Sequence, residues 1–149
     1  MSGSPRAPCS PTLQSANGGK IATMSEKEHW RSEPDEHDYP AAQDYLTLVM
    51  SPAAAKGLVE ALKTAPLLHR AAKDLLRASA LALLPENNYH VAKDLNKVKR
   101  GQLLSPVLLV AGDASRGAHL TIADGYHRIC ASWYLNEDQA IPCRLVDLP

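Results

Sequence analysis

Apolar residues recur at helical spacing between residues 40 and 80 of the chain. Their intervals of three and four predict three successive helices. Ser51-Pro52 is a typical start for the second helix, and Pro66 is expected to start the third. The apolar positions of the three helices are Ala42, Tyr45, Leu46 and Val49; Ala55, Leu58, Val59 and Leu62; and Leu68, Ala71, Ala72, Leu75 and Leu76.

After Pro85 the pattern changes to short apolar runs that alternate with helical stripes. A helix through Val91, Leu95 and Val98 ends in basic residues before Gly101, where the helix dipole and a C-cap glycine favour termination. Further predicted elements are a buried strand at 106–110, a turn at 112–117, an antiparallel strand at 119–123, a helix at 126–135 and a strand at 141–146, which Pro142 places near a sheet edge.

These elements predict an α+β fold, a small mixed sheet with surrounding helices, preceded by a helical segment. We expect a single domain over residues 40–149, divided into a helical leader at 40–80 and a sheet-bearing part at 81–149. Residues 1–39 are predicted to be a disordered tail, because the stretch up to Gly19 is rich in Ser, Pro, Gly and Asn without an apolar period.

The chain has 149 residues with 16 Lys and Arg against 16 Asp and Glu, so its formal charge is zero. Neutrality argues against DNA as a partner, since non-specific DNA affinity comes largely from basic residues. No run of about 20 apolar residues and no apolar signal-peptide core is present, so we expect no membrane and a cytoplasmic protein. Met24 is an alternative start to Met1. The cysteines, Cys9, Cys130 and Cys143, lack metal-ligand spacing and are expected to be reduced thiols.

Candidate chemistry is concentrated in Asp124-Gly125-Tyr126-His127-Arg128, where a predicted strand turns into a helix. The first backbone N–H groups of a helix lack intrahelical partners and form a site for anions. Gly125 lets a phosphate approach the backbone, Arg128 supplies a charged fork, and His127 can donate to a phosphate or move a proton. Asp124 can hold a metal ion, orient a hydroxyl or cap the helix. The pattern predicts a nucleotide-phosphate site.

A purely structural interpretation of the same residues remains open. Asp-Gly is among the commonest turn pairs, and Asp124 can serve as a helix cap alone. A single histidine such as His127 is more often structural than functional.

The segment from Leu83 to Pro149 resembles the ParB/sulfiredoxin-like superfamily. The order of its elements is similar, and Gly125, Arg128 and Ala131 have the G-x-x-R-x-x-A spacing that this superfamily places at a strand-to-helix phosphate site. The resemblance implies the ParB/sulfiredoxin-like fold and a bound nucleotide.

Departures from the motif distinguish the branches of this superfamily. Sulfiredoxins have their catalytic cysteine where this chain has Tyr126, and partition ParB proteins have an arginine in place of His127 and a further helix-turn-helix domain, for which the chain offers no room. The motif is most similar to that of the free-serine kinases, Asp-Gly-His-His-Arg, from which it differs at Tyr126. Those kinases use a glutamate before the first long helix as a base, which implies Glu86 here; a first-turn acid stabilised by the helix dipole is the alternative role.

The leading hypothesis is a nucleotide-binding domain, which the resemblance extends to a phosphotransferase acting on a small hydroxyl acceptor. The ligand is expected to be ATP, ADP or CTP, with Mg²⁺ held by Asp124. In the catalytic version Glu86 or Asp124 takes the hydroxyl proton, and His127 contacts the transferring group. The residues expected to bind the nucleotide are Gly125, Tyr126, His127 and Arg128.

Two other functions remain open. The apolar faces of the helices at 41–80 can form a homodimer interface, so the chain is alternatively a non-catalytic regulatory or interaction module that keeps the fold. Nuclease activity is a second alternative, for which only Asp124 and Glu86 are available near the motif as metal carboxylates.

Overall fold

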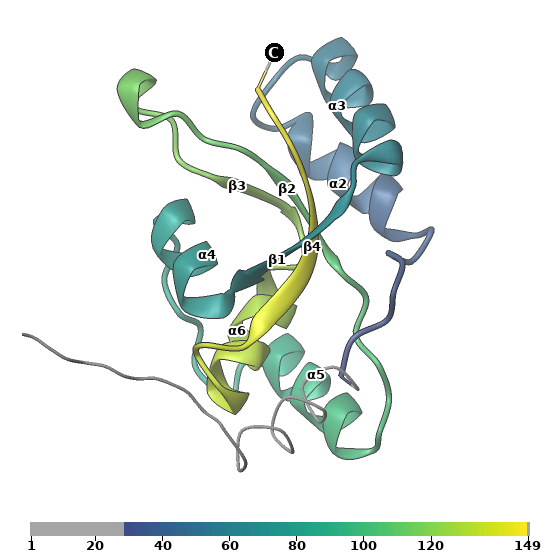
Figure 1. Ribbon diagram of the computed structural model, residues 1–149, viewed down its shortest axis with the longest axis vertical. Helices are drawn as coiled ribbons and strands as arrows, with labels where there is room; N and C mark the ends of the chain where they lie inside the picture. The colour runs from purple at the N-terminus through teal and green to yellow at the C-terminus, as the bar shows by residue number, and fades with distance from the viewer. Residues whose placement is uncertain (1–28, 149) are drawn as a thin grey trace, which may run out of the picture.

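The computed structural model describes residues 29–148, which form an α+β fold around one sheet (Figure 1). This confirms the fold class predicted from the sequence. No helix in this range combines the length and the apolar character that crossing a bilayer requires. The elements are, in chain order, α2 (Asp38–Leu46), α3 (Pro52–Thr64), β1 (Leu67–Ala71), α4 (Ala72–Ser79), α5 (Tyr89–Lys99), β2 (Val107–Val110), the 3-10 turn η2 (Ala114–Arg116), β3 (Thr121–Asp124), α6 (Tyr126–Leu135) and β4 (Ala140–Val146).

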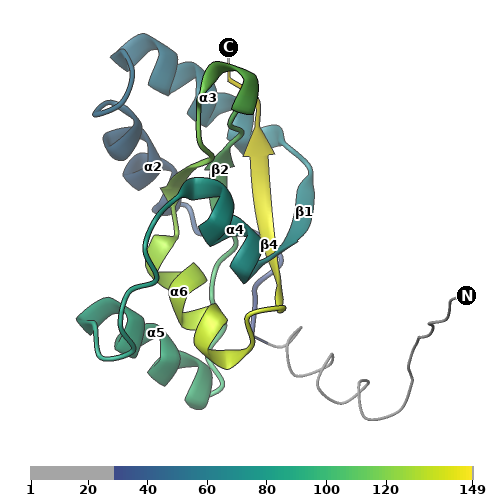
Figure 2. The same ribbon diagram turned by 90° about the vertical axis from the view of Figure 1, so that its left-hand side faces the viewer.

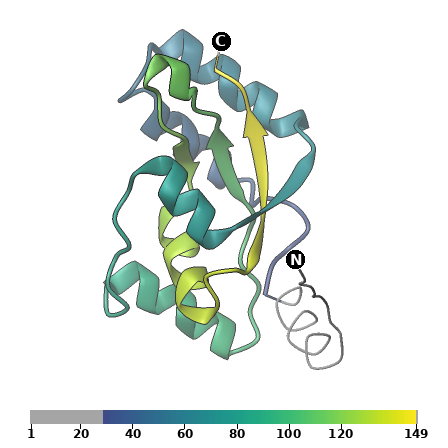
Figure 3. The ribbon, with the colours of Figure 1, turned by 60° about the vertical axis from the view of Figure 1, so that its left-hand side comes forward.

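The four strands form one mixed sheet in the order β1-β4-β2-β3. β1 pairs with β4, and β2 with β3, in antiparallel orientation, whereas β2 and β4 run parallel. In Figure 3 the yellow β4 crosses the sheet with the teal β1 on one side and the green β2 and β3 on the other. The central strands therefore come from the second half of the chain, and β1 joins them from the first half.

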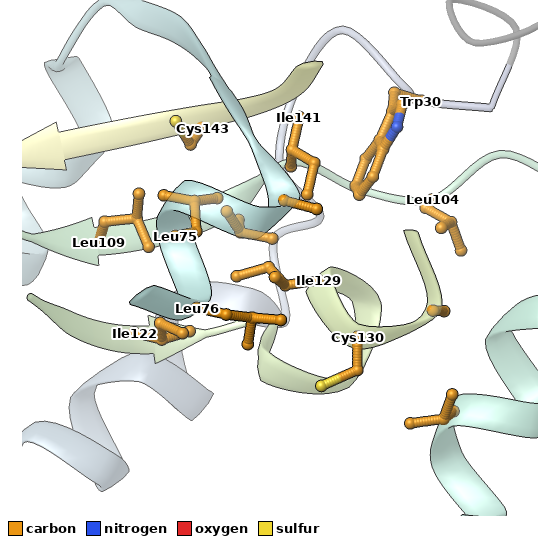
Figure 4. Packing of buried hydrophobic residues seen from close by; sticks show 14 residues of the cluster. Trp30, Leu75, Leu76, Leu104, Leu109, Ile122, Ile129, Cys130, Ile141 and Cys143 are labelled. Carbon is orange, nitrogen blue, oxygen red and sulfur yellow. The ribbon is translucent and has the colours of Figure 1, made fainter. Parts of the chain in front are cut away.

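Helices cover both faces of the sheet (Figure 1, Figure 2). α2 and α3 pack on one face, against Leu108 and Val110 of β2. α4, α5 and α6 pack on the opposite face, to which Val107 and Leu109 of β2 belong. All four side chains of β2 are buried, which explains why this strand is a continuous apolar run. Figure 4 shows the core of the second face, where Leu75, Leu76 and Ile129 from the helices meet Leu109, Ile122 and Ile141 from the strands.

The predicted helical leader contains a strand, which corrects the prediction of a third helix from Pro66. The helix starts only at Ala72, and β1 precedes it, with Leu68 opposite Cys143 of β4. The apolar positions on both sides of Ala72 share one helical spacing, so the sequence gives no local signal for the change. Pairing with a strand distant in sequence determines the conformation. Residues 40–80 thus contribute to the same sheet as the motif-bearing part.

β4 lies inside the sheet, so the prediction that Pro142 marks a strand near the edge is wrong. Its pairing with β2 begins only at Cys143, opposite Val107, whereas Pro142 itself lies opposite His69 of β1. The proline thus precedes the part of β4 that has a strand on both sides. A missing N–H is tolerated there, because no bond to β2 is lost at that position.

The prediction of a tail up to residue 39 is wrong for its described part. Trp30 is 8% exposed and belongs to the core around α4 and α6. A backbone bridge fixes it: the Arg31 N–H donates to Leu104 O at 2.8 Å, and the Leu104 N–H donates to His29 O at 2.7 Å. The rest of the predicted tail, residues 1–28, lies outside the described residues, as does Cys9.

Candidate functional site

The junction between β3 and α6 lies where the sequence predicts it. β3 ends at Asp124, α6 begins at Tyr126, and Gly125 between them has φ +113°. A Cβ atom on Gly125 would lie 2.8 Å from Val107 Cβ and 2.8 Å from Arg128 Nη2, so packing as well as backbone conformation requires glycine here. No side chain of residues 29–148 caps α6. The N–H groups of its first turn therefore remain open to a ligand.

Arg128, one turn into α6, is held by three side chains from three segments. Its Nη2 donates to Asp124 Oδ2 at 2.9 Å, and its Nη1 donates to Ser105 Oγ at 2.7 Å and lies 3.6 Å from Asp38 Oδ2. Ser105 Oγ in turn donates to Asp38 Oδ2 at 2.7 Å. The side chain of Arg128 is 15% exposed, so these contacts are shielded from water. Arg128 fixes α6, α2 and the segment before β2 to one another.

Asp124 is the titratable group of this network that is perturbed most strongly. Its pKa is raised from 3.8 to about 6, mainly by burial and also by the neighbouring Asp38, while Arg128 opposes both. Desolvation outweighs the attraction of Arg128, whose guanidinium also lies beside Asp38. Asp124 therefore changes protonation state close to neutral pH.

Two histidines lie against each other beside this network. The ring centroids of His90 on α5 and His127 on α6 are 4.7 Å apart. Burial lowers the pKa of His127, with further lowering by His90 and Arg128, whereas Asp94 raises it. The imidazole of His127 is thus predominantly neutral at pH 7 and can donate through one ring N–H.

A pocket of about 350 Å³ opens at the start of α6. Four segments line it: residues 31–38, the α5 helix, residues 103–105 and the β3–α6 junction. Its charged and titratable lining side chains are Arg31, Asp35, His37, Asp38, His90, Lys93, Asp94, Lys97, Asp124, His127 and Arg128. Arg31 pairs with Asp35 at 3.2 Å, whereas Lys93 and Lys97 form no ion pair within residues 29–148.

The structure brings together most, but not all, of the predicted site residues. Asp124, Gly125, His127 and Arg128 line the pocket. Tyr126 does not: its hydroxyl donates to Ala82 O, and its ring packs against the core. Glu86 also lies outside the pocket lining, and its side chain is exposed in the turn before α5.

The predicted Mg²⁺ ligand Asp124 does not stand in a metal-binding group. In the part of the chain that the structure describes, no three His, Cys, Asp or Glu side chains are placed to hold a metal ion. Asp124 Oδ2 accepts from Arg128, and the nearest carboxylate, Asp38, belongs to the same network. These residues do not fit a metal ion held by the protein itself.

Sequence reasoning missed several residues of the site. Asp38 lies in the predicted tail, and Ser105 precedes β2 without any motif. Asp94 had a recognisable signal, because it falls one position before Leu95 and three after Val91, on the apolar stripe of its helix. A carboxylate on a buried helix face is rare enough to indicate a special role.

Comparison with known proteins adds no assignment. No family model, no curated protein and no solved structure matches this chain. The resemblance to the ParB/sulfiredoxin-like superfamily therefore stays a prediction.

Proposed function

We propose that the chain is a nucleotide-binding domain, with the phosphate groups bound at the start of α6. The observation that carries the proposal is the uncapped first turn of α6, which opens into a pocket that also holds Lys93 and Lys97 without ion-pair partners. Open backbone N–H groups and the positive end of the helix dipole favour an anion there. The two lysines add charge on the facing helix, α5.

The contacts suggest how the residues share this task. Because Arg128 is bonded to Asp124 and Ser105, its first role is to hold the junction in shape, while the backbone amides of α6 and the lysines face the phosphates. His127 supplies a neutral donor. Phosphate beside it would raise its pKa, so nucleotide affinity should increase as the pH falls from neutral towards the lowered pKa of the free imidazole.

Phosphoryl transfer to a small hydroxyl acceptor is the second candidate function, and the raised pKa of Asp124 favours it. A pKa of about 6 lies near neutral pH, where a general base works best. Asp124 would take the hydroxyl proton as the oxygen forms its bond to the terminal phosphorus and the bond to the nucleoside diphosphate breaks. Glu86, outside the pocket, has no part in this version. Mg²⁺ would enter only with the nucleotide's own phosphates.

Buried, unbridged cysteines are compatible with the cytoplasmic location that the sequence suggests. Cys130 and Cys143 are both free and buried. Reduced thiols of this kind are typical of a reducing compartment.

Isothermal titration with ATP, ADP and CTP, each with and without Mg²⁺, tests the proposed phosphate site. We expect Lys97→Ala to weaken binding roughly tenfold, the factor for one charge-assisted hydrogen bond. Lys99→Ala is the matched control, since Lys99 lies on the same helix outside the pocket lining and should leave the affinity unchanged. The absence of heat with every nucleotide, or equal effects of the two substitutions, would refute the proposal.

A further inference from the structure

Asp94 is the most unusual side chain of the pocket. It lies on α5 and lines the pocket, yet the residue is only 9% exposed. On its helix it is buried together with the apolar Val91. A charged residue that is nine-tenths buried normally has a bonded partner.

Asp94 has no such partner among residues 29–148: it makes neither a hydrogen bond nor an ion pair there. Four cationic or titratable side chains act on it from a distance, His90 and Lys97 on its own helix and His127 and Arg128 on α6. Asp35, Asp38 and Asp124 line other walls of the same pocket. Burial raises the pKa of Asp94 in spite of these positive neighbours.

The carboxylate of Asp94 is largely desolvated by the fold and is reached only from the pocket, so a hydrogen-bond donor on a ligand in the pocket would stabilise it. A metal ion does not suit the site, since no three metal-binding side chains are gathered there in the described chain. An ammonium group would meet Lys93 and Lys97 in the same pocket. A neutral donor, a hydroxyl group, remains as the complement of Asp94.

We propose that Asp94 accepts a hydrogen bond from the ribose hydroxyls of the bound molecule, and that the ligand of this pocket is a ribonucleotide. The inference rests on the proposed phosphate site and specifies the sugar. Carboxylates accept hydrogen bonds from ribose hydroxyls in dinucleotide-binding folds. A nucleotide carries phosphate and hydroxyl groups only a few bonds apart, so one pocket of about 350 Å³ can take both.

Opposite effects of one substitution on two ligands test this inference. The probes are tripolyphosphate, ATP and CTP, and the 2′,3′-dideoxy forms of both nucleotides, titrated into the wild type and Asp94→Leu. We expect the wild type to prefer each ribonucleotide over its dideoxy form by roughly tenfold to a hundredfold, as for a hydrogen bond to a charged group. Asp94→Leu should lose this preference and bind tripolyphosphate several-fold more tightly, because a negative charge has left the pocket.

Folding of the variant is controlled within the same experiment. Asp94→Leu should have a higher Tm than the wild type, because a buried unpaired charge is replaced by an apolar side chain. Asp44→Asn, an exposed acid on α2 that forms no ion pair among residues 29–148, should change neither Tm nor ligand preference. Equal affinity of the wild type for ribo- and dideoxynucleotides, or a preference that survives in Asp94→Leu, would overturn the inference while leaving the phosphate site intact. No binding of tripolyphosphate or of any nucleotide to the wild type would overturn both.

Discussion

At the scale of single residues, Asp124 couples the pH of the medium to the stability of the fold. Its pKa is about 6 in the folded chain against an ordinary value of 3.8, so the folded state binds a proton that the unfolded state releases. The stability from this proton is present below pH 4 and is lost as the pH rises to about 6. We predict that the free energy of unfolding of the wild type, relative to that of Asp124→Asn, decreases between pH 4 and about 6 and is constant at higher pH.

Urea unfolding of both proteins at intervals between pH 4 and 7.5 measures this difference. Asp94, whose pKa is also raised, is present in both chains and cancels. Asp44→Asn, at an exposed position of α2, serves as the control and should run parallel to the wild type at every pH. If the free energies of unfolding of Asp124→Asn and the wild type changed in parallel with pH, the raised pKa of Asp124 would be contradicted.

Gly125 is the residue on which the geometry of the junction depends. We predict that Gly125→Ala lowers the free energy of unfolding by about 2–4 kcal/mol, from the unfavourable positive φ together with overpacking against Val107. Thermal and urea unfolding check the value. Gly57→Ala, inside α3 with open space around it, should instead stabilise the chain by up to about 1 kcal/mol. Equal changes in the two variants would show that the crowding at Gly125 is relieved by a small shift.

At the scale of elements, α3 anchors one face of the sheet. We predict that Leu62→Ala, at a fully buried position of α3, lowers the free energy of unfolding by about 2–5 kcal/mol. Leu48 lies two residues beyond the end of α2 and is 79% exposed, so Leu48→Ala should change stability by less than about 0.5 kcal/mol. Similar losses in both variants would mean that Leu48 is covered in solution.

The same comparison bears on the homodimer predicted through the helices at 41–80. The apolar faces of α2 and α3 are buried on their own sheet, and the large apolar side chains that remain exposed near them are Tyr45, Leu48 and Val49. A dimer through this region would therefore use the end of α2. Truncation before residue 81 would remove β1 and half of the core, so sedimentation of Leu48→Ala against the wild type is the cleaner measurement.

At the scale of the whole molecule, residues 29–38 close both the core and the pocket. Trp30 fills the core, while Asp35, His37 and Asp38 form one wall of the pocket. We predict that Trp30→Ala lowers the free energy of unfolding by about 3–5 kcal/mol, the usual cost of truncating a buried aromatic side chain. It should also weaken the proposed nucleotide binding, because the pocket wall at residues 35–38 loses the buried side chain that holds it in place. Ser32→Ala, exposed two residues away, is the control for both measurements.

The sequence predicts those parts of the molecule that local signals determine. The helix at 126–135 and the turn into it have the predicted bounds, because Asp-Gly and the apolar period act within a few residues. The position of β4 in the sheet, and β1 itself, depend on pairing between distant residues, which periodicity does not report. Trp30 is a single apolar residue among polar neighbours, so no hydrophobic periodicity predicts that it is buried. In the site, the motif identified one wall of the pocket, and the acids Asp38 and Asp94 on the other walls needed the fold.

The position of β4 has a consequence for biosynthesis. β4 follows the other strands in the chain, yet it lies between β1 and β2. When β1 has emerged from the ribosome during synthesis, its partner strand β4 is still missing. β1 can pair only after residues 140–146 have left the ribosome. At a synthesis rate of about 5–20 residues per second, this interval of roughly 70 residues lasts several seconds. Throughout it, Leu67 and Leu68 and the apolar faces of α2 and α3 lack part of their native cover, and chaperones that bind nascent chains can act on these segments.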